Sequence, residues 1–361
     1  MLRLMTYIPY FSFNSIRYDK LLTEFAKLFE VYVLAGVRPR GDSIKKTNNY
    51  KVLYVVPFYL PGRVRQIFYP FYRMLMPLNI VRADVLWLIG KTGPPQLLIT
   101  KQPIVLDIED PRITLPDEEL HSQPRLYLIN ELRLLRNKKV RKVVVPTEMI
   151  KRKFIALGLD EDRISVIPNG VDTSLFNPTP LTKEPVVLYY GTFHPIRAKL
   201  LLEVIDVLVR RRRDVRFLLV GDIPPSVRNK LLHVAGNRVE MPGFVEHDRL
   251  PRYIEMARVC ILPQNSSLGR GGSLKLLEYM ASGRPIVATN VDESFPLKES
   301  GAGIITEIDA EAMAEAIIRL FDDDKLAEEF ARKGVEYAQK YNWDKIVEDY
   351  VRLFYQIYND Q

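Results

Sequence analysis

The sequence predicts an α/β protein built from two doubly wound, Rossmann-like domains. Its 361 residues exceed the size of one ordinary domain. In both halves, short apolar runs typical of buried strands alternate with amphipathic segments typical of helices. A proline-rich stretch over 173–184 separates the two series and indicates a linker. We therefore expect a first domain over 1–175, a second over 183–340, and a closing helical segment over 341–361.

The composition is that of a globular chain, with 47% hydrophobic and 27% charged residues. The single cysteine, Cys260, lies in an apolar run, which excludes a disulfide framework and favours a reducing, cytoplasmic location. Residues 1–8 match a strand rather than a signal peptide, and no apolar run approaches the ~18 residues that span a bilayer. The four histidines are scattered without metal-site spacing.

The net charge of +8 is unevenly distributed along the chain. Residues 1–180 hold 27 Lys and Arg against 17 Asp and Glu, whereas 181–361 hold 25 against 27. A basic half attracts nucleic acid, anionic lipid or a phosphorylated acceptor. The sequence shows neither a nucleic-acid module nor an aromatic stacking platform, so we expect no nucleic-acid partner.

The first residues predict a strand–loop–helix–strand unit with parallel strands. The expected strands cover 2–8 and 30–34, and the expected helix covers 17–29. The loop between them opens at the carboxyl end of the strands, where ligands bind in such sheets. Asn14, Ser15 and Arg17 are therefore candidates for contacts on this side of the molecule.

A basic, aromatic-rich segment over 59–82 is a candidate membrane contact. Its arginines, such as Arg63, Arg65 and Arg73, are interspersed with phenylalanine and tyrosine. Such a segment can lie in a membrane interface, and contact with the anionic inner face of the membrane is one of two interpretations. The alternative is a core-facing helix whose arginines point to solvent.

Carboxylates follow a predicted strand over 104–108. Glu109 lies where the strand ends, and a carboxylate at that position can stabilise positive charge or accept a hydrogen bond from a ligand hydroxyl. Capping of the following turn is the alternative. Asp107 and Asp110 are weaker candidates. Further along, 124–142 is expected to be one long helix that ends in a basic turn.

The most informative stretch of the chain is 263–290. A buried strand over 259–262 is followed by a glycine-rich loop over 269–273, a helix over 274–281 and a strand over 285–289. Loop amides and a helix N-terminus together form an anion site, with Ser273 as a possible cap. Glu278, one turn further on, can accept hydrogen bonds from a ribose-like diol. An ordinary βαβ crossover explains the same pattern without a ligand.

The segment KLLEYMASGRPIVATN, residues 275–290, resembles the donor-binding segment of retaining GT-B-fold glycosyltransferases of the family-four type, which use nucleotide-sugars. Residues 143–176 resemble the end of the first domain in that family. The resemblance implies two Rossmann-like domains facing across a cleft, with the acceptor on the first and the donor on the second. It also implies a final helix that crosses back to the first domain, and no obligate metal or other cofactor.

The resemblance assigns roles to individual residues. Glu278 becomes the ribose ligand, while Arg270 stands where the family has a first glutamate and Glu109 where it often has a histidine. The family's base-binding turn falls on Gly243, Phe244 and Val245. The remaining implied donor contacts are Gly191, Thr192, Gly271, Gly272, Ser273 and Leu274.

Basic residues after the first strand of the second domain hold the donor diphosphate in this family. The usual arginine is replaced by Thr192, so Arg197 and Lys199 are the expected clamp and the expected catalytic partners of Glu109. For each cation, a solvated helix position is the alternative.

The implied reaction is transfer of a hexose-type sugar, with retention, from a UDP- or GDP-linked donor to a glycan, lipid-linked or other anionic acceptor. Cell-surface polysaccharide synthesis is the expected setting. Two alternatives stay open: an epimerase or phosphorylase on the same fold, and a non-catalytic binding protein, which Arg270 and Glu109 favour.

Overall fold

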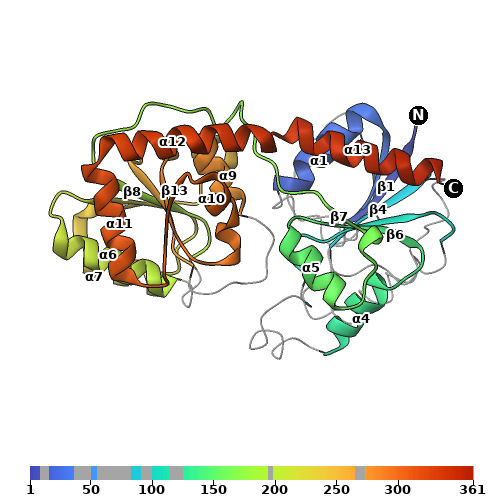
Figure 1. The fold of residues 1–361 in the computed structure, drawn as a ribbon, viewed down its shortest axis with the longest axis horizontal. Helices are drawn as coiled ribbons and strands as arrows, with labels where there is room; N and C mark the ends of the chain where they lie inside the picture. The colour runs from blue at the N-terminus through green and yellow to red at the C-terminus, as the bar shows by residue number, and fades with distance from the viewer. Residues whose placement is uncertain are drawn as a thin grey trace. The chain divides into compact units, whose positions relative to one another are not determined.

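The computed structural model of the chain describes residues 1–8, 16–35, 50–54, 83–90, 100–111, 113, 125–193, 198–264 and 273–360. They form two compact units (Figure 1). The first unit contains Met1–Pro168 and the C-terminal segment Trp343–Gln361. The second contains the other described residues, which lie between Asn169 and Asn342. Each unit is described by itself.

The first unit is built on a parallel sheet. In the part of the chain that the structure describes, the sheet has seven strands in the order β3-β2-β1-β4-β5-β6-β7. The strands are β1 (Arg3–Ile8), β2 (Glu30–Ala35), β3 (Tyr50–Tyr54), β4 (Val85–Ile89), β5 (Ile104–Asp107), β6 (Val140–Val145) and β7 (Ile164–Val166). Strands β4 and β5 are buried along their whole length, as expected for a parallel sheet covered on both faces.

Helices pack on this sheet (Figure 1). They are α1 (Ile16–Leu28), α4 (Arg125–Leu135), α5 (Glu148–Ala156) and α13 (Trp343–Asn359), with a 3₁₀ turn η3 at Glu161–Arg163. Helix α13 packs against α1 and β4 through its apolar side, which includes Tyr350 and Phe354. Thr147 caps the N-terminus of helix α5, because its side chain accepts a hydrogen bond from the Ile150 amide.

Helix α4 is shorter than the sequence predicts. It ends at Leu135 rather than at residue 142, because Asn137 closes a turn directly after it. The Asn137 side chain accepts from the Lys139 amide at 2.9 Å, and its carbonyl accepts from the Val140 amide at 3.0 Å. The chain then enters β6 at Val140. The basic residues that the sequence assigned to the last turn of the helix therefore lie in a turn and in the first residues of a strand.

The second unit repeats the architecture with a six-stranded parallel sheet in the order β10-β9-β8-β11-β12-β13. The strands are β8 (Val186–Tyr190), β9 (Arg216–Val220), β10 (Val239–Gly243), β11 (Val259–Leu262), β12 (Ile286–Thr289) and β13 (Gly303–Thr306). From β8 the chain adds strands on one side and then, from β11, on the other. The order reverses between β8 and β11, and ligands of doubly wound sheets bind at such a point, beyond the carboxyl ends of the strands.

Helices cover this second sheet as well. They are α6 (Ala198–Arg211), α7 (Pro225–Ala235), α8 (Leu250–Ile254), α9 (Leu274–Ala281), α10 (Phe295–Ser300), α11 (Ala310–Asp322) and α12 (Asp324–Ala338). Short 3₁₀ turns occur at η4 (Gly236–Arg238), η5 (His247–Arg249), η6 (Asp292–Ser294) and η7 (Gln339–Tyr341).

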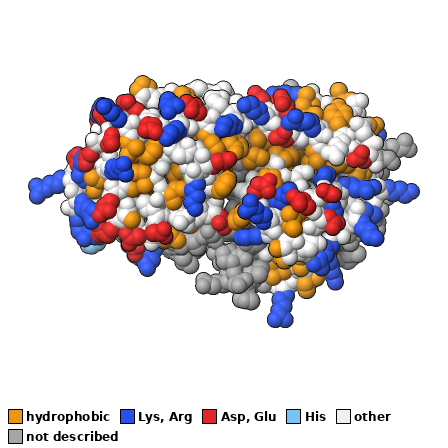
Figure 2. Space-filling view, viewed as in Figure 1, with side chains coloured by type: hydrophobic (Ala, Val, Ile, Leu, Met, Phe, Trp, Pro, Cys, Tyr) orange, Lys and Arg blue, Asp and Glu red, His pale blue; other side chains and the backbone are white. Residues whose placement is uncertain are grey.

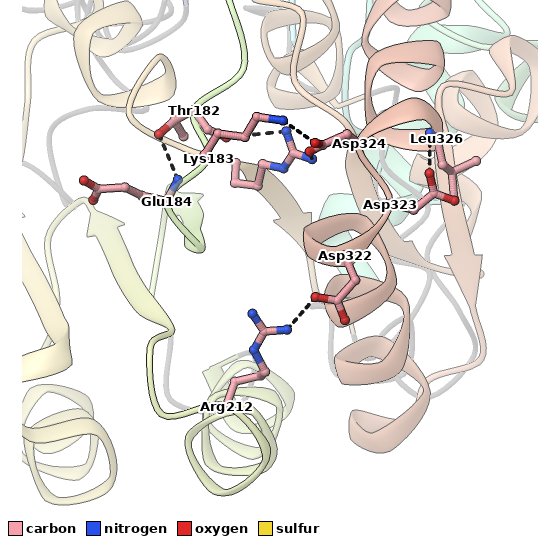
Figure 3. A network of polar contacts seen from close by, with 9 residues as sticks. Thr182, Lys183, Glu184, Arg212, Asp322, Asp323, Asp324 and Leu326 are labelled. Atoms are coloured by element: carbon pink, nitrogen blue, oxygen red, sulfur yellow. Dashed lines mark hydrogen bonds and ion pairs between the residues drawn. The ribbon is translucent and has the colours of Figure 1, made fainter.

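The proline-rich segment before β8 is fastened to the second unit. The buried Arg284 guanidinium donates to the carbonyl oxygens of Thr179 at 2.9 Å and Pro180 at 3.2 Å. A second buried arginine, Arg258, contacts Asp324 at 2.5 Å, and Asp324 also pairs with Lys183 (Figure 3). These bonds attach the end of the linker that the sequence placed at 173–184 to the second unit, which begins at Asn169.

The surface drawn in Figure 2 carries charges of both signs. On that face, Lys and Arg side chains are interspersed with Asp and Glu over the described residues. The segment over 59–82, which the sequence indicates as a membrane contact, lies outside the described residues. Among the helices that the structure describes, none combines the length and apolar character that crossing a membrane requires.

Candidate functional site

The ends of β8, β9 and β10 form a closely packed edge in the second unit. Gly191 and Gly221 follow β8 and β9, and their φ angles are +138° and +144°. Residues with a Cβ atom rarely adopt such angles, whereas glycine does so readily. A Cβ on Gly221 would lie 2.1 Å from the Gly191 carbonyl oxygen. The Gly221 amide donates to the Gly243 carbonyl at 2.8 Å. Glycine is therefore required at 221 for the backbones to meet at this edge.

Helix α9 begins beside the same edge. Ser273 occupies its N-cap position with an extended backbone, but its side chain makes no capping hydrogen bond. The expected cap is therefore absent, and Ser273 and Leu274 are both half-buried. The first turn of α9 contains no acidic residue and has Lys275 as its second residue.

Glu278 lies one turn into α9 and is only 2% exposed. Its Oε1 lies 2.7 Å from His247 Nε2, and its Oε2 accepts a hydrogen bond from the Tyr190 hydroxyl. Tyr190 is the last residue of β8, and its amide donates to the Tyr279 hydroxyl at 3.1 Å. Desolvation by burial raises the pKa of Glu278 well above its ordinary value. The carboxyl group is thus held in a polar cluster with Tyr190 and His247, and its role as a diol acceptor stays a prediction.

Sequence reasoning missed both partners of Glu278. His247 lies 31 positions before it and stands in η5, where nothing in the local pattern distinguishes it from a surface histidine. The centroid of the His247 ring lies 5.2 Å from the centroid of the Phe176 ring. Tyr190 directly precedes Gly191. Its position at the carboxyl end of a strand is the one sequence signal that could have indicated Tyr190 as a residue of the site.

Of the two cations that the sequence proposed near β8, the structure describes Lys199. Arg197 lies outside the described residues. The Lys199 side chain is 77% exposed and lies 3.8 Å from Glu203 on the next turn of α6, the position of a solvated helix residue. Lys275 was missed: its Nζ would lie 2.7 Å from a Cβ on Gly191, and it stands 5.6 Å from the centroid of the Tyr189 ring.

The turn after β10 exposes a large aromatic side chain at this edge. Gly243 has φ of +84°, and the Phe244 side chain that follows is 73% exposed. Val245 is half-buried against the core of the second unit. At the end of β8, Thr192 is exposed and its carbonyl accepts from the Tyr189 hydroxyl at 3.2 Å.

In the first unit, Arg17, which the sequence names as a candidate acceptor contact, has a buried side chain. Its side chain is fully buried and donates to the Pro168 carbonyl at 2.9 Å, the Ile167 carbonyl at 3.1 Å and the Tyr350 hydroxyl at 2.6 Å. It also lies 3.7 Å from the buried Asp107 carboxylate. These contacts give Arg17 a structural role, and its contact with an acceptor stays a prediction.

Asp107 and Glu109 have contrasting surroundings at the end of β5. Asp107 is fully buried and accepts from Trp87 Nε1 at 3.2 Å and from the Tyr350 hydroxyl. Burial raises its pKa, although the neighbouring Arg17 opposes the shift. Glu109 is half-buried, and its negative charge acts on Arg17 and Tyr18. Of these acids, Glu109 is the one with access to solvent.

Several residues named from the sequence lie outside the described part of the chain. They are Asn14, Ser15, Arg197, Arg270, Gly271 and Gly272. Within the described residues, no group of three or more histidine, cysteine or acidic side chains could hold a metal ion.

Comparison with known proteins places the fold in a class. The structure superposes on sucrose-phosphate synthase from Thermosynechococcus elongatus with a TM-score of 0.83 at 18% identity, covering 100% of both chains. It also superposes on HepE from Anabaena, solved in complex with UDP and glucose, with a TM-score of 0.78 at 16% identity, covering 99% of this chain and 100% of that one. At these identities the likeness shows the fold, which is the GT-B fold of two Rossmann-like domains.

The sequence itself matches two glycosyltransferase family models. "Glycosyltransferase Family 4" matches residues 18–175, and "Glycosyl transferases group 1" matches residues 184–323. The chain belongs to the group 1 glycosyltransferases of the family-four type, as the sequence indicated.

Curated relatives match over part of their length. Alpha-D-kanosaminyltransferase from Streptomyces kanamyceticus is 32% identical over 171 residues, which are 45% of this chain and 43% of the relative. Phosphatidyl-myo-inositol mannosyltransferase from Mycolicibacterium smegmatis is 28% identical over 215 residues, which are 57% of this chain and 55% of the relative. The match thus spans about half the length of each relative.

Proposed function

We propose that this chain transfers a hexose-type sugar, with retention of configuration, from a UDP- or GDP-linked donor to a glycan or lipid-linked acceptor. Glu278 carries the proposal, because a buried carboxyl group stands at the switch point of the second sheet in a chain of this family. The Anabaena neighbour is described in complex with UDP-glucose, which supports a donor of this kind.

In this proposal, the ribose hydroxyls of the donor bind Glu278. A carboxylate accepts about four hydrogen bonds; in the structure Tyr190 donates one, and His247 Nε2 lies 2.7 Å from the other oxygen. The ribose diol would use the remaining positions or replace one of these partners. Added donors favour the charged form of a buried carboxyl group, so binding would offset its desolvation.

The neighbouring elements would hold the rest of the nucleotide. Backbone groups at Gly243 and Val245, beside the exposed Phe244, are proposed to meet the base. The amides of Ser273 and Leu274, at the start of α9, would face the diphosphate together with Gly271, Gly272 and Arg270. Arg197 and Lys199 remain proposed clamp residues, and Gly191 and Thr192 proposed backbone contacts.

The chemistry would be electrostatic. As the glycosidic bond to the donor breaks, negative charge accumulates on the leaving diphosphate, and fixed amides and cations stabilise it. We propose that these amides and cations take the place of an obligate metal. At the edge of the first sheet, the half-buried Glu109 is proposed to accept a hydrogen bond from the acceptor hydroxyl.

An anionic or lipid-linked acceptor agrees with two observations. Residues 1–180 hold the entire positive excess of the chain. Among the relatives, the enzyme from Mycolicibacterium smegmatis is a phosphatidyl-myo-inositol mannosyltransferase. The proposal includes peripheral contact with an anionic membrane surface.

A thermal-shift screen tests the proposal. The protein is melted alone and with UDP-glucose, UDP-N-acetylglucosamine, GDP-mannose and ADP-glucose, since a ligand of the native state raises the melting temperature. We expect one base to give a clear shift, which Glu278→Ala abolishes and Glu328→Ala, an exposed control on α12, preserves. The absence of a shift with every donor would overturn the proposal. A donor that is converted without any acceptor would indicate an epimerase instead.

A further inference from the structure

We propose that Lys275 binds the diphosphate of the nucleotide and supplies the positive charge that Thr192 lacks at the end of β8. This inference rests on the proposed function and names one residue of that site. The sequence did not indicate Lys275, because it belongs to a helix and not to the loop after β8.

The position of the ammonium group is the first support. A Cβ on Gly191 would lie 2.5 Å from Lys275 Cε and 2.7 Å from its Nζ, so the lysine tip lies against the backbone at the carboxyl end of β8. The Nζ also stands 5.6 Å from the centroid of the Tyr189 ring, within the range of a cation–π contact. The side chain therefore points toward the switch point of the sheet rather than into bulk solvent.

The relation of Lys275 to Glu278 is the second support. Residues three apart lie on one face of a helix, so both side chains face the end of β8, where Lys275 meets Gly191 and Glu278 meets Tyr190. Three residues correspond to about 4.5 Å along the helix axis. In a nucleoside diphosphate, the 5′ oxygen of the ribose carries the diphosphate as a phosphate ester. A ribose on Glu278 would thus bring the diphosphate toward the N-terminal end of α9, where Lys275 stands.

The sign of the charge is the third support. The N-terminus of a helix is the positive end of its dipole, and a cation in the first turn is unfavourable there. Lys275 is the second residue of α9, and no acidic residue shares that turn. A diphosphate reverses this penalty, because amides, dipole and ammonium would then all face the same anion.

Isothermal titration with three matched ligands tests the inference. UDP, UMP and uridine are titrated into the wild-type protein and into Lys275→Met, which keeps the apolar stem and removes the charge; GDP, GMP and guanosine replace them if the thermal-shift screen selects guanine. We expect the diphosphate to bind roughly 10- to 100-fold more weakly to the variant, as the loss of one charged hydrogen bond implies. The nucleoside should bind both proteins equally.

Matched variants separate binding from folding. Lys275→Arg should restore most of the diphosphate affinity, and Lys230→Met, at an exposed position on α7, should behave as wild type. Without ligand, Lys275→Met should show the cooperative melting transition of a folded protein, so that a loss of diphosphate affinity can be assigned to binding. Lys275→Gln gives the same comparison if the methionine variant does not fold.

The outcomes distinguish this inference from the function on which it rests. Diphosphate affinity that is unchanged in Lys275→Met would overturn the inference and leave the proposed function intact. An equal loss for nucleoside and diphosphate would also overturn it, because it would show a general structural effect. If the wild-type protein binds no nucleoside diphosphate, both proposals fail together.

Discussion

The Tyr350 hydroxyl donates a hydrogen bond to the Asp107 carboxylate, although the two residues stand 243 positions apart. The same hydroxyl accepts from Arg17 at 2.6 Å, and Trp87 Nε1 donates to Asp107 at 3.2 Å. The ring of Phe25 on α1 packs edge-on against Tyr350 at 5.6 Å. One polar cluster, buried among aromatic rings, therefore fastens the last helix of the chain to the sheet of the first unit.

Tyr350→Phe should lower the free energy of unfolding by about 1.5–3 kcal/mol, because it removes hydrogen bonds to two charged groups in a buried place. Urea denaturation of the variant and the wild type measures the change. Tyr358→Phe, on the same helix and 44% exposed, is the control and should stay within about 0.5 kcal/mol of wild type. Equal stability of Tyr350→Phe and Tyr358→Phe would contradict the role of the cluster.

Glu278→Gln should change how stability depends on pH. Burial raises the pKa of Glu278 above its ordinary 4.5, so in the range between the two values the folded chain holds a proton that the unfolded chain has released. This contribution to stability is fully present below 4.5 and is lost as the pH rises through the folded pKa. The glutamine variant does not titrate, so its stability relative to wild type should increase with pH over that window.

Urea denaturation of both proteins from pH 4.5 upward checks this prediction. A stability difference that stays constant across the range would show that Glu278 is not the titrating group. Glu328→Gln, at an exposed position on α12, should leave the profile unchanged.

Tyr190→Phe should act in opposite directions on the free and the liganded protein. Without ligand, one oxygen of the buried Glu278 loses its donor, which should cost about 1.5–3 kcal/mol of stability. A ribose hydroxyl would replace that donor, so the nucleotide-induced rise in melting temperature should exceed that of the wild type. Differential scanning fluorimetry with and without UDP measures both effects, and a smaller ligand shift in the variant would argue that Tyr190 itself holds the ligand.

The basic segment over 59–82 yields a prediction from sequence alone. Replacing Arg63, Arg65 and Arg73 together by glutamine should weaken binding to vesicles that contain phosphatidylserine, because each cation near such a surface contributes about 1 kcal/mol. A triple variant of Lys325, Arg332 and Lys333 on α12 controls for net charge. Co-sedimentation that is the same for the wild type and the first variant would exclude this surface contact.

The sequence predicted the fold well because the hydrophobic periodicity and the order of the elements indicate the same architecture in both halves. Apolar runs and amphipathic segments alternate regularly in both halves, so the parallel sheets and the covering helices follow from local periodicity. The helix of Glu278 was predicted over 274–281 and is found at Leu274–Ala281. Helix α4 was predicted too long, because the turn at Asn137 breaks a stretch that has helical composition.

The surroundings of Glu278 could not be predicted, because they depend on contacts between distant elements. His247 reaches the carboxyl group from η5, and Lys275 approaches Gly191 only once α9 has packed beside β8. Arg17 is a similar case, because the sequence places it near a ligand-binding edge but only the fold shows that its side chain is fully buried. In each case the residue type was visible in the sequence, but its neighbours were not.

The most direct test of the account is a crystal structure of the protein with the nucleoside diphosphate that the thermal-shift screen selects. The account predicts ribose hydroxyls on Glu278, with Tyr190 or His247 displaced or sharing the carboxylate, and the diphosphate at the start of α9. A nucleotide bound elsewhere in the chain, with Glu278 still enclosed by Tyr190 and His247, would contradict it.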